Sequence, residues 1–444
     1  MKKMRIKKHL STFQIIILGF AGVILLGAIL LMLPISSANG IVTPFNETLF
    51  TATSAVCVTG LVVKDTATHW SSFGQAVILT LIQIGGLGVV TVAASFALLS
   101  GRKITLMQRS TMQEALAAQK VGGIVRLTGF ILKATFLFEL IGALSLMPSF
   151  CKEYGLKGIW MSFFHSISAF CNAGFDILGK EESLFPSLTS FNLNISVNVV
   201  IMLLIIVGGI GFLTWEDIYV HKYRLRKYRM QSKVILITTA VLILLPALFY
   251  YLYDFRDMPL KERIITSLFQ SVTPRTAGFN TTNLSAMTSV GRLIMIVLML
   301  IGGSPGSTAG GMKTTTIAVL FANAIAVFRK KDDAHFFGRR IEAGIIKNAA
   351  TILSLYLVLF LGGGICISVI EGIPLETCLF ETASAVGTVG LSLGLTPTLS
   401  LASRIILIIL MFLGRVGGLT MIYATLSEKR KNVSKFPNEK ITVG

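Results

Sequence analysis

A short segment recurs four times along this chain, each time between two long hydrophobic spans. In every copy a phenylalanine precedes a serine or threonine by four positions and a glycine by nine or ten. The four glycines are Gly60, Gly174, Gly278 and Gly390. They are separated by 114, 104 and 112 residues, so whole structural units repeat rather than the turns of a solenoid. Four divergent copies in one chain predict pseudo-fourfold symmetry around a central axis.

The spans between these segments predict an all-α polytopic membrane protein. Hydrophobic residues make up 53% of the chain, charged residues 14%, and the mean hydropathy is +0.76. The uncharged stretch Phe13 to Leu33 is long enough to cross about 30 Å of hydrocarbon and too long for a signal-peptide core. Further spans are expected at 73–99, 127–147, 192–215, 233–253, 287–327, 343–370 and 399–426. Eight crossings and four re-entrant loops follow.

Basic residues predict the orientation, because cytoplasmic loops retain Lys and Arg. Of the forty, twenty-seven fall in five clusters, at 1–12, 101–126, 222–233, 329–347 and 427–441. Successive clusters bracket one repeat, which predicts cytoplasmic termini and half-loops that enter from outside. The expected units are 1–100, 101–221, 222–328 and 329–426, followed by a cytoplasmic tail at 427–444. The net charge of +19 is explained in this way, so nucleic-acid binding is not expected.

The recurring glycines predict an ion filter. Irregular backbone at membrane depth is tolerated where it lines a wet cavity, and glycine allows consecutive carbonyls to face one axis. A ring of carbonyls replaces the water shell of an alkali cation, and the carboxyl ends of the preceding half-helices favour the same charge. A single glycine would more often be a packing residue, but four in matched context favour the filter. The predicted filter residues are Val58, Thr59, Gly60, Asn172, Ala173, Gly174, Thr276, Ala277, Gly278, Thr388, Val389 and Gly390.

The fourth copy contains Thr388-Val389-Gly390, the first three letters of the potassium-channel filter TVGYG. With this motif and the four-loop pattern, essentially the whole chain resembles the Trk/Ktr/HKT superfamily of potassium transporters, most closely Ktr membrane subunits of the KtrB or KtrD type. In that family each repeat is two membrane helices flanking a pore helix and a filter loop, and one chain makes one pore. Plant relatives that favour sodium tend to have serine at the first filter position. The resemblance therefore implies that Gly60 belongs to a potassium filter, with potassium held by the filter carbonyls.

The same resemblance implies a homodimer on a cytosolic ring of nucleotide-binding regulatory subunits of the KtrA or KtrC type, reached through the basic loops and the tail. Such subunits bind ATP, ADP or cyclic-di-AMP. Membrane lipids are the other expected contact. The third loop departs from the family pattern, since it is one residue short and carries Pro274 and Arg275.

A glycine-rich run interrupts the span at 287–327, and proline with several glycines cannot sustain a helix there. The run also resembles a nucleophile elbow and a phosphate loop, but no His and Asp are positioned to form a triad, and Met312 interrupts the Gly-Lys-Thr sequence that a phosphate loop needs. The remaining reading is an intramembrane gate beneath the filter, which the family also has. The predicted gate residues are Gly302, Gly303, Ser304, Pro305, Gly306, Ser307, Thr308, Gly310, Gly311, Lys313 and Arg415.

Two of these gate residues carry charge. Arg415 lies about 18 Å along a helix from the last basic cluster, too deep to reach the surface easily, so it requires acceptors. Broken-helix carbonyls would supply them, and we expect Arg415 to hold the gate loop closed, as the family arginine does. Lys313 either hinders cations or extends to the cytoplasmic end of its helix.

Other residues are expected to have lesser roles. Asp65 and Asp176 follow their filter glycines and either attract cations to an outer mouth or are ordinary loop carboxylates. Glu381 is expected to be buried structure, and the glycine pairs 85–86 and 208–209 to be packing positions. The five cysteines have neither metal-ligand spacing nor a disulfide pattern, and no cofactor is implied.

The sequence thus predicts potassium uptake by the ion-translocating subunit of a Ktr-type system, with sodium dependence left open. An enzyme is not expected. The alternatives are a secondary cation symporter with a site at the midplane, a membrane-embedded hydrolase using Ser304, and a scaffold. Repeats that all begin on one side favour a pore over inverted repeats.

Overall fold

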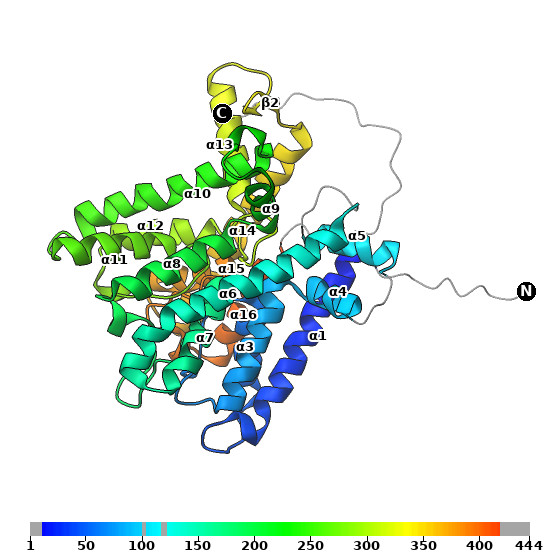
Figure 1. Ribbon diagram of the computed structural model, residues 1–444. Coiled ribbons are helices and arrows are strands. Elements are labelled where there is room, and N and C mark those ends of the chain that lie inside the picture. Colours follow the sequence, from blue (N-terminus) through cyan, green and yellow to red (C-terminus); the bar gives the residue numbers. More distant parts are fainter. Residues whose placement is uncertain (1–10, 100–103, 117–121, 418–444) are drawn as a thin grey trace, which may run out of the picture.

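The computed structural model describes residues 11–99, 104–116 and 122–417. Its regular structure is helical apart from one short hairpin, which confirms the expected all-α fold. Figure 1 shows the helices gathered into one bundle, from which α13 and the hairpin project. The expected tail at 427–444, the first basic cluster up to residue 10 and the end of the last span lie outside the described residues.

Each repeat contains a long first helix (M1), a short half-helix and a second hydrophobic helix (M2). In repeat 1 these are α1 (Thr12–Met32), α2 (Phe45–Cys57) and α3 (Ser72–Leu87). In repeat 2 they are α6 (Ile124–Tyr154), α7 (Lys157–Phe170) and α8 (Ile195–Gly209). In repeat 3 they are α10 (Met230–Phe249), α11 (Leu260–Val272) and α12 (Ser289–Leu300). In repeat 4 they are α14 (Ala343–Glu371), α15 (Leu375–Gly387) and α16 (Leu401–Val416).

The remaining elements extend or connect the repeats. They are α4 (Val89–Leu99), α5 (Leu106–Ala115), α9 (Phe212–His221), α13 (Thr314–Phe328), and the antiparallel strands β1 (His335–Phe336) and β2 (Arg339–Arg340). One π-helical turn continues α10 over Tyr250–Asp254. Short 3₁₀ turns lie at Pro34–Ser36, Thr189–Phe191, Leu225–Lys227, Leu284–Ala286 and Thr396–Thr398.

The four repeats close into a ring. The M2 helix of each repeat packs on the half-helix of the next one, through the pairs α3 with α7, α8 with α11, and α12 with α15. The last M2 helix, α16, packs on the first half-helix, α2, so the cycle is complete. This arrangement turns a linear fourfold repeat into pseudo-fourfold symmetry and directs all four half-helices to one central region.

Polar caps mark where the M2 helices begin. The side chains of Ser71, Asn194, Thr288 and Ser400 each accept a backbone N–H from the first turn of the following helix. Such caps satisfy donors that a helix start leaves free. Each M2 helix therefore starts at a position that its own sequence specifies.

Two spans that were expected to be continuous are bent. The span at 73–99 turns by 97° between α3 and α4, and the span at 192–215 turns by 98° between α8 and α9. The sequence indicated one apolar span over each range but not the turn within it, which occurs because Gly88 and Gly211 have φ of 85° and 92°. A residue with positive φ cannot continue a right-handed helix. Hydropathy alone did not reveal the turn, since both sides of it are apolar.

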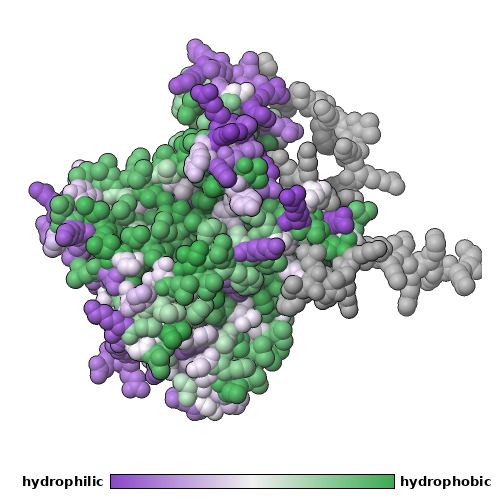
Figure 2. Space-filling model, in the orientation of Figure 1, coloured by the Kyte–Doolittle hydropathy of each residue, from purple (hydrophilic) through white to green (hydrophobic). Residues whose placement is uncertain are grey.

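Length and apolarity mark α1, α6, α10 with its π turn, and α14 as helices that can each cross a membrane. The two bent pairs raise that number to as many as six in the described part of the chain. The other two predicted spans correspond to the interrupted segment from α12 to α13 and to α16. Figure 2 shows a broad hydrophobic face on the bundle, with hydrophilic residues gathered on the projection that carries α13 and β2. The chain is a multi-pass membrane protein.

Candidate functional site

The four repeat glycines meet at the centre of the ring. Their φ angles are 90° at Gly60, 68° at Gly174, 80° at Gly278 and 94° at Gly390. Each loop lies so close to the next that a Cβ atom added to its glycine would collide with the neighbouring loop. The contacts run from Gly60 to the loop of Gly174, then to the loops of Gly278 and Gly390, and back to the loop of Gly60. Both the backbone conformation and the close approach of neighbouring loops therefore require glycine.

A second positive φ occurs two residues before each glycine. The values are 56° at Val58, 59° at Asn172, 69° at Thr276 and 52° at Thr388. In a regular strand the backbone geometry alternates and successive carbonyls point in opposite directions. Left-handed residues at every second position interrupt that alternation, so successive carbonyls of each loop can face the same side.

The serine or threonine of the repeat anchors each loop to its half-helix. Its carbonyl oxygen accepts the N–H of the residue before the glycine in all four loops, at 2.8 to 3.0 Å. Ser54 and Ser384 also accept the glycine N–H on their hydroxyls at 3.0 Å. Ser168 and Thr273 instead donate their hydroxyls to the carbonyl of the residue after the glycine. The spacing seen in the sequence therefore corresponds to specific backbone contacts.

The third loop reaches the same geometry with one residue fewer. Its half-helix ends before Thr273, because Pro274 has no N–H with which to continue the helix. The N–H of Ala277 still bonds to the carbonyl of Thr273 at 3.0 Å. Positive φ angles fall at Thr276 and Gly278, the positions that match those of the other loops.

Side chains join the second and third loops. Asn172 donates from Nδ2 to the carbonyl of Arg275 and to Oγ1 of Thr276, both at 3.3 Å. The guanidinium of Arg275 bonds to Thr239 of α10 at 3.3 Å, so it faces the surrounding helix. The cross-link through Asn172 was not expected from the sequence, where this residue was assigned only a backbone role.

The chemistry of the ring is that of uncharged oxygen. The hydroxyls of Thr59 and Thr388 are buried and lack a partner in the described part of the chain. Within that part, no cluster of three or more His, Cys, Asp or Glu side chains is suited to a metal ion. Carbonyls and hydroxyls without carboxylates suit a monovalent alkali cation that exchanges water for them. The ends of four half-helices add partial negative charge.

A cavity of about 750 Å³ opens on the glycine side of the ring and touches all four loops. Asp65 and Asp176 both line it. Asp65 is held in place by backbone N–H groups, including that of Phe185 in the next repeat at 2.9 Å. Asp176 accepts the N–H of Leu178 at 3.2 Å. Asp65 therefore connects two loops, whereas Asp176 is the freer carboxylate of the cavity.

The interrupted segment at 301–313, here called the gate loop, lies on the other side of the ring. Thr308 donates its hydroxyl to the carbonyl of Phe170 at 3.1 Å and lies 3.4 Å from Oδ1 of Asn172. A side chain on Gly310 would collide with Thr388. Asn172 and Thr388 each lie two residues before a repeat glycine, whereas the 750 Å³ cavity adjoins the glycines themselves. The gate loop thus covers the end of the ring opposite the cavity.

The M2 helices of repeats 2 and 4 hold this loop through its backbone. The N–H of Ser304 bonds to the carbonyl of Gly209 at 2.9 Å, and that of Gly311 to the carbonyl of Gly414 at 3.2 Å. These carbonyls belong to the last turns of α8 and α16, where carbonyl oxygens lack intrahelical N–H donors. The loop is therefore ordered by its neighbours although its sequence forms no helix.

Arg415 connects the gate loop to a distant repeat. Its Nη1 donates to the carbonyl of Thr308, and its Nη2 donates to the carbonyls of Gly85 and Gly86. The first acceptor belongs to the gate loop and the other two to the end of α3. The expectation that a deep arginine must find backbone acceptors agrees with these contacts, but the sequence offered no sign that α3 would supply them.

Lys313 and Ser304 each bond within the segment. Nζ of Lys313 donates to the carbonyls of Ala309 and Gly310, at 2.9 and 3.1 Å, so it turns back into the gate loop instead of extending along α13. Oγ of Ser304 lies 3.2 Å from Oγ1 of Thr314. Ser304 has no histidine partner in the described structure, so the nucleophile-elbow reading lacks its general base.

A signal for the bent spans is present in the sequence, although hydropathy does not show it. In repeats 1, 2 and 4 the M2 helices end at Gly85-Gly86-Leu87-Gly88, Gly208-Gly209-Ile210-Gly211 and Gly414-Arg415-Val416-Gly417. In repeat 3 the matching run Gly302-Gly303-Ser304-Pro305 follows the end of α12 at Leu300. The fourth residue of each run is a glycine with positive φ, except in the gate loop, where it is Pro305. The first glycines of repeats 1, 2 and 4 press against the carbonyls that end a half-helix, which fits the packing role expected for them. Arg415 stands where three repeats have a second glycine.

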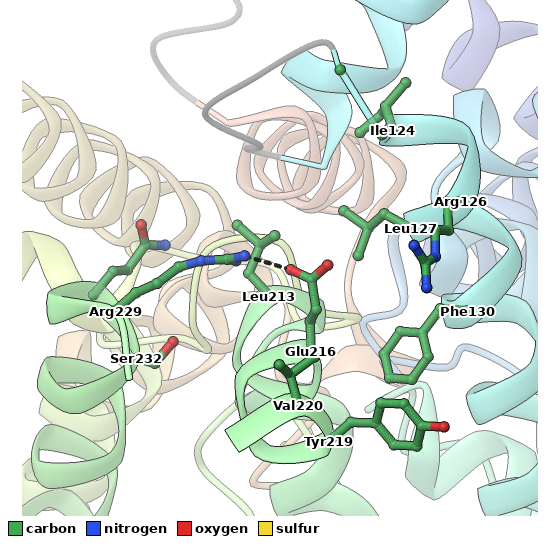
Figure 3. Close-up of a pocket in the computed structure, with 13 residues that line it drawn as sticks. Ile124, Arg126, Leu127, Phe130, Leu213, Glu216, Tyr219, Val220, Arg229 and Ser232 are labelled. Carbon is green, nitrogen blue, oxygen red and sulfur yellow. Dashed lines mark hydrogen bonds and ion pairs between the residues drawn. The ribbon is translucent and has the colours of Figure 1, made fainter. Parts of the chain in front are cut away.

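Two further polar features lie apart from the ring centre. Glu381 is fully buried and accepts hydrogen bonds from Ser392 at 2.6 Å and Thr396 at 2.7 Å, which agrees with a structural role. A cavity of about 610 Å³ lies between the starts of α6 and α10 and helix α9 (Figure 3). Arg229 reaches Glu216 across it at 2.6 Å, whereas Arg126 lines it without an ion pair among the described residues. None of the predicted filter or gate residues lines that cavity.

Comparison with known proteins gives a consistent result. A family model described as TrkH, a cation transport protein, matches residues 7–435. The chain is 41% identical to the potassium/sodium uptake protein NtpJ of Enterococcus hirae, across 100% of this chain and 99% of that protein. It is 38% identical to the Ktr system potassium uptake protein B of Bacillus subtilis, across 97% of this chain and 96% of that protein.

A solved structure is similar as well. The potassium transporter TrkH from Vibrio parahaemolyticus matches with a TM-score of 0.75, covering 96% of this chain and 87% of that one. Their sequences are 17% identical, so this likeness bears on the fold alone. It supports the ring of four repeats described above.

Proposed function

The chain belongs to the TrkH family of cation transport proteins, a family of transporters rather than enzymes, and on this premise we propose that it takes up potassium across the plasma membrane through the ring of four loops. One observation carries the proposal. Four glycine loops close on one another with positive φ at matching positions, which supports a ring whose carbonyls surround a single axis. The two relatives reported above are both named as potassium uptake proteins.

The ion preference follows from the same ring. Glycine at all four positions leaves the backbone oxygens as the ligands, which suits potassium. The Enterococcus hirae relative is named for potassium and sodium, and this supports the further proposal that uptake depends on sodium.

We also propose that the gate loop blocks the path and opens by leaving its place beneath the ring. Its contacts with Asn172 and Thr388 put it against the filter loops, and Arg415 holds it through the carbonyl of Thr308. In the closed state Arg415 would hold the gate loop against α3, and Lys313 would stabilise the loop through its own carbonyls. Release of the arginine would free the loop to move.

The basic clusters support cytoplasmic termini, with the 750 Å³ cavity as the outer mouth. A relative named as part of a Ktr system supports a membrane subunit that works with other components. We propose that these are cytosolic nucleotide-binding subunits and that the chain forms a homodimer. The orientation is tested with a cysteine placed at Lys227. If this basic cluster is cytoplasmic, the cysteine should react with an impermeant thiol reagent only after the membrane is opened.

A secondary cation symporter remains the second candidate. The observation in its favour is that two spans are bent by 97° and 98°, between α3 and α4 and between α8 and α9, because symporters bind ions at interrupted helices. The parallel order of the repeats favours a pore. Potassium flux into purified vesicles that hold sodium on both sides, with and without a sodium gradient, separates the two, because a pore that depends on sodium still carries potassium when the gradient is absent.

The central test is potassium uptake in a transport-deficient bacterium at low external potassium. We expect the natural chain to restore growth and Gly60→Ser to admit sodium and weaken potassium selectivity, because its Cβ would collide with the carbonyl of Ala173. Gly22→Ser is the matched control, since a Cβ at Gly22 meets nothing within 4 Å. Unchanged selectivity in a well-folded Gly60→Ser protein would refute the filter.

A further inference from the structure

A groove of about 540 Å³ runs between α10 and α13. Its walls are apolar, with Ile237 and Val241 from α10 and Phe321 and Ile325 from α13. All four side chains are well exposed, and Phe321 keeps 67% of its surface accessible. Apolar side chains along two membrane helices present a surface that an acyl chain can cover.

One end of this groove is basic. Arg329 and Lys331, which follow α13, line it together with His335 of β1. Neither Arg329 nor Lys331 forms an ion pair with a carboxylate in the described structure. The hairpin's own Asp333 is engaged by Arg340 at 3.2 Å. These two cations thus stand beside an apolar groove without an ion-pair partner among the described residues, although the exposed carboxylate of Asp332 follows Lys331 in the chain.

An apolar groove that ends in cations without ion-pair partners is complementary to a molecule with a hydrocarbon chain and an anionic headgroup. We propose that the groove binds one anionic phospholipid, its acyl chain along α10 and α13 and its phosphate at Arg329 and Lys331. Basic residues at a membrane surface attract anionic headgroups, and arginine pairs well with phosphate oxygens. Hydrophilic residues gather on the projection that carries α13, which is consistent with a headgroup level there (Figure 2).

Charge favours a lipid over a second copy of the chain as the occupant. With a net charge of +19, another copy is a poor partner for a patch of unpaired cations, whereas a phosphodiester neutralises it. The site has a consequence for the gate, because α13 begins at Thr314, immediately after Lys313 of the gate loop. A lipid along α13 would restrain the helix into which the gate loop leads.

The test is lipid binding by the purified full-length chain in detergent. Delipidated protein is titrated with phosphatidylglycerol, phosphatidylcholine or inorganic phosphate, and both bound lipid and melting temperature are measured. We expect saturable phosphatidylglycerol binding with a rise in melting temperature, and little effect of the other two. Removing both cations in R329Q/K331Q should weaken phosphatidylglycerol binding about 30-fold.

R226Q/K227Q is the matched control, because it removes the same charge from exposed residues of another cytoplasmic cluster and should bind as the natural chain does. A322W, which fills the groove without changing charge, should also abolish binding. Equal binding of phosphatidylcholine, stabilisation by phosphate alone, or unchanged affinity in R329Q/K331Q would each overturn the proposal. So would a disulfide between two chains through F321C at full yield, which would identify a second copy as the occupant. These readouts do not use transport, so their outcome is independent of the pore.

Discussion

Arg415 of the last described helix donates a hydrogen bond to the carbonyl oxygen of Gly85 in the first repeat. The acceptor lies in the last turn of α3, where the Gly85 carbonyl also accepts the capping N–H of Gly88 at 3.1 Å. One side chain thus joins the two ends of the fourfold ring and, through Thr308, the gate loop as well. Because one of the three carbonyl acceptors of Arg415 belongs to the gate loop, the loop cannot leave its place without breaking that hydrogen bond.

Replacing this arginine should open the closed state. Hydrogen bonds to a charged group contribute about 1.5–3 kcal/mol each, so Arg415→Gln should raise basal potassium flux by about tenfold or more. Flux into vesicles without regulatory subunits measures this. Arg404→Gln is the control, because Arg404 lies on the same helix and bonds only to the local carbonyl of Pro397 at 2.8 Å. A folded Arg415→Gln protein with natural basal flux would show that the arginine is not a latch.

Thr308 offers a milder change to the same loop. Thr308→Val keeps the volume and loses the hydroxyl bond to the carbonyl of Phe170. Since one hydrogen bond has a net worth of about 1 kcal/mol, basal flux should rise about fivefold. Thr351→Val is the control, since Thr351 is exposed and bonds within its own helix. Equal flux in both variants would argue that the loop is held by its backbone alone.

Loss of a filter anchor should affect selectivity. Ser54→Ala leaves the buried N–H of Gly60 without its acceptor at a cost of about 1–3 kcal/mol. We expect a lower ratio of potassium to sodium uptake, because the Gly60 carbonyl is then less well placed. Competition between the two ions in uptake assays measures it. Ser145→Ala, at an exposed position of α6, is the control and should leave this ratio unchanged. If Ser54→Ala and Ser145→Ala give the same ratio, the hydroxyl of Ser54 does not position the loop of Gly60.

The bend after α3 can be tested through stability. Gly88→Ala forces a side chain to adopt φ of 85°, which costs about 1–2 kcal/mol, although the nearest neighbour of the new Cβ, Oγ1 of Thr91, is 3.8 Å away. The melting temperature in detergent should therefore fall. Gly22→Ala lies inside α1 with open space around it and should raise stability by about 0.5–1 kcal/mol. The two variants should therefore shift the melting temperature in opposite directions. An unchanged melting temperature for Gly88→Ala would mean that the bend accommodates a side chain.

Some features of the ring could be predicted because they depend on local chemistry. Long apolar runs predict membrane helices, and a glycine at a fixed distance after Phe-x3-[Ser/Thr] predicts a recurring loop. The glycine-rich run before Lys313 predicts an interruption, since no neighbour can make proline and several glycines helical. Such conclusions need only a few consecutive residues. The turns at Gly88 and Gly211 were missed because apolar residues flank them, although the spacing Gly-Gly-x-Gly carried the signal.

By itself, the sequence determined that the chain has four related membrane units, where their helices and loops fall, and that a deep Arg415 must find acceptors. Only the tertiary structure decided which groups those are. The order in which Gly60, Gly174, Gly278 and Gly390 face one another, and the contact of Arg415 with Gly85, join segments from different repeats. Every broken helix exposes similar carbonyls, so the residue pattern cannot choose among them. The choice is made by the packing of each M2 helix on the next half-helix, which brings one particular set within hydrogen-bonding distance.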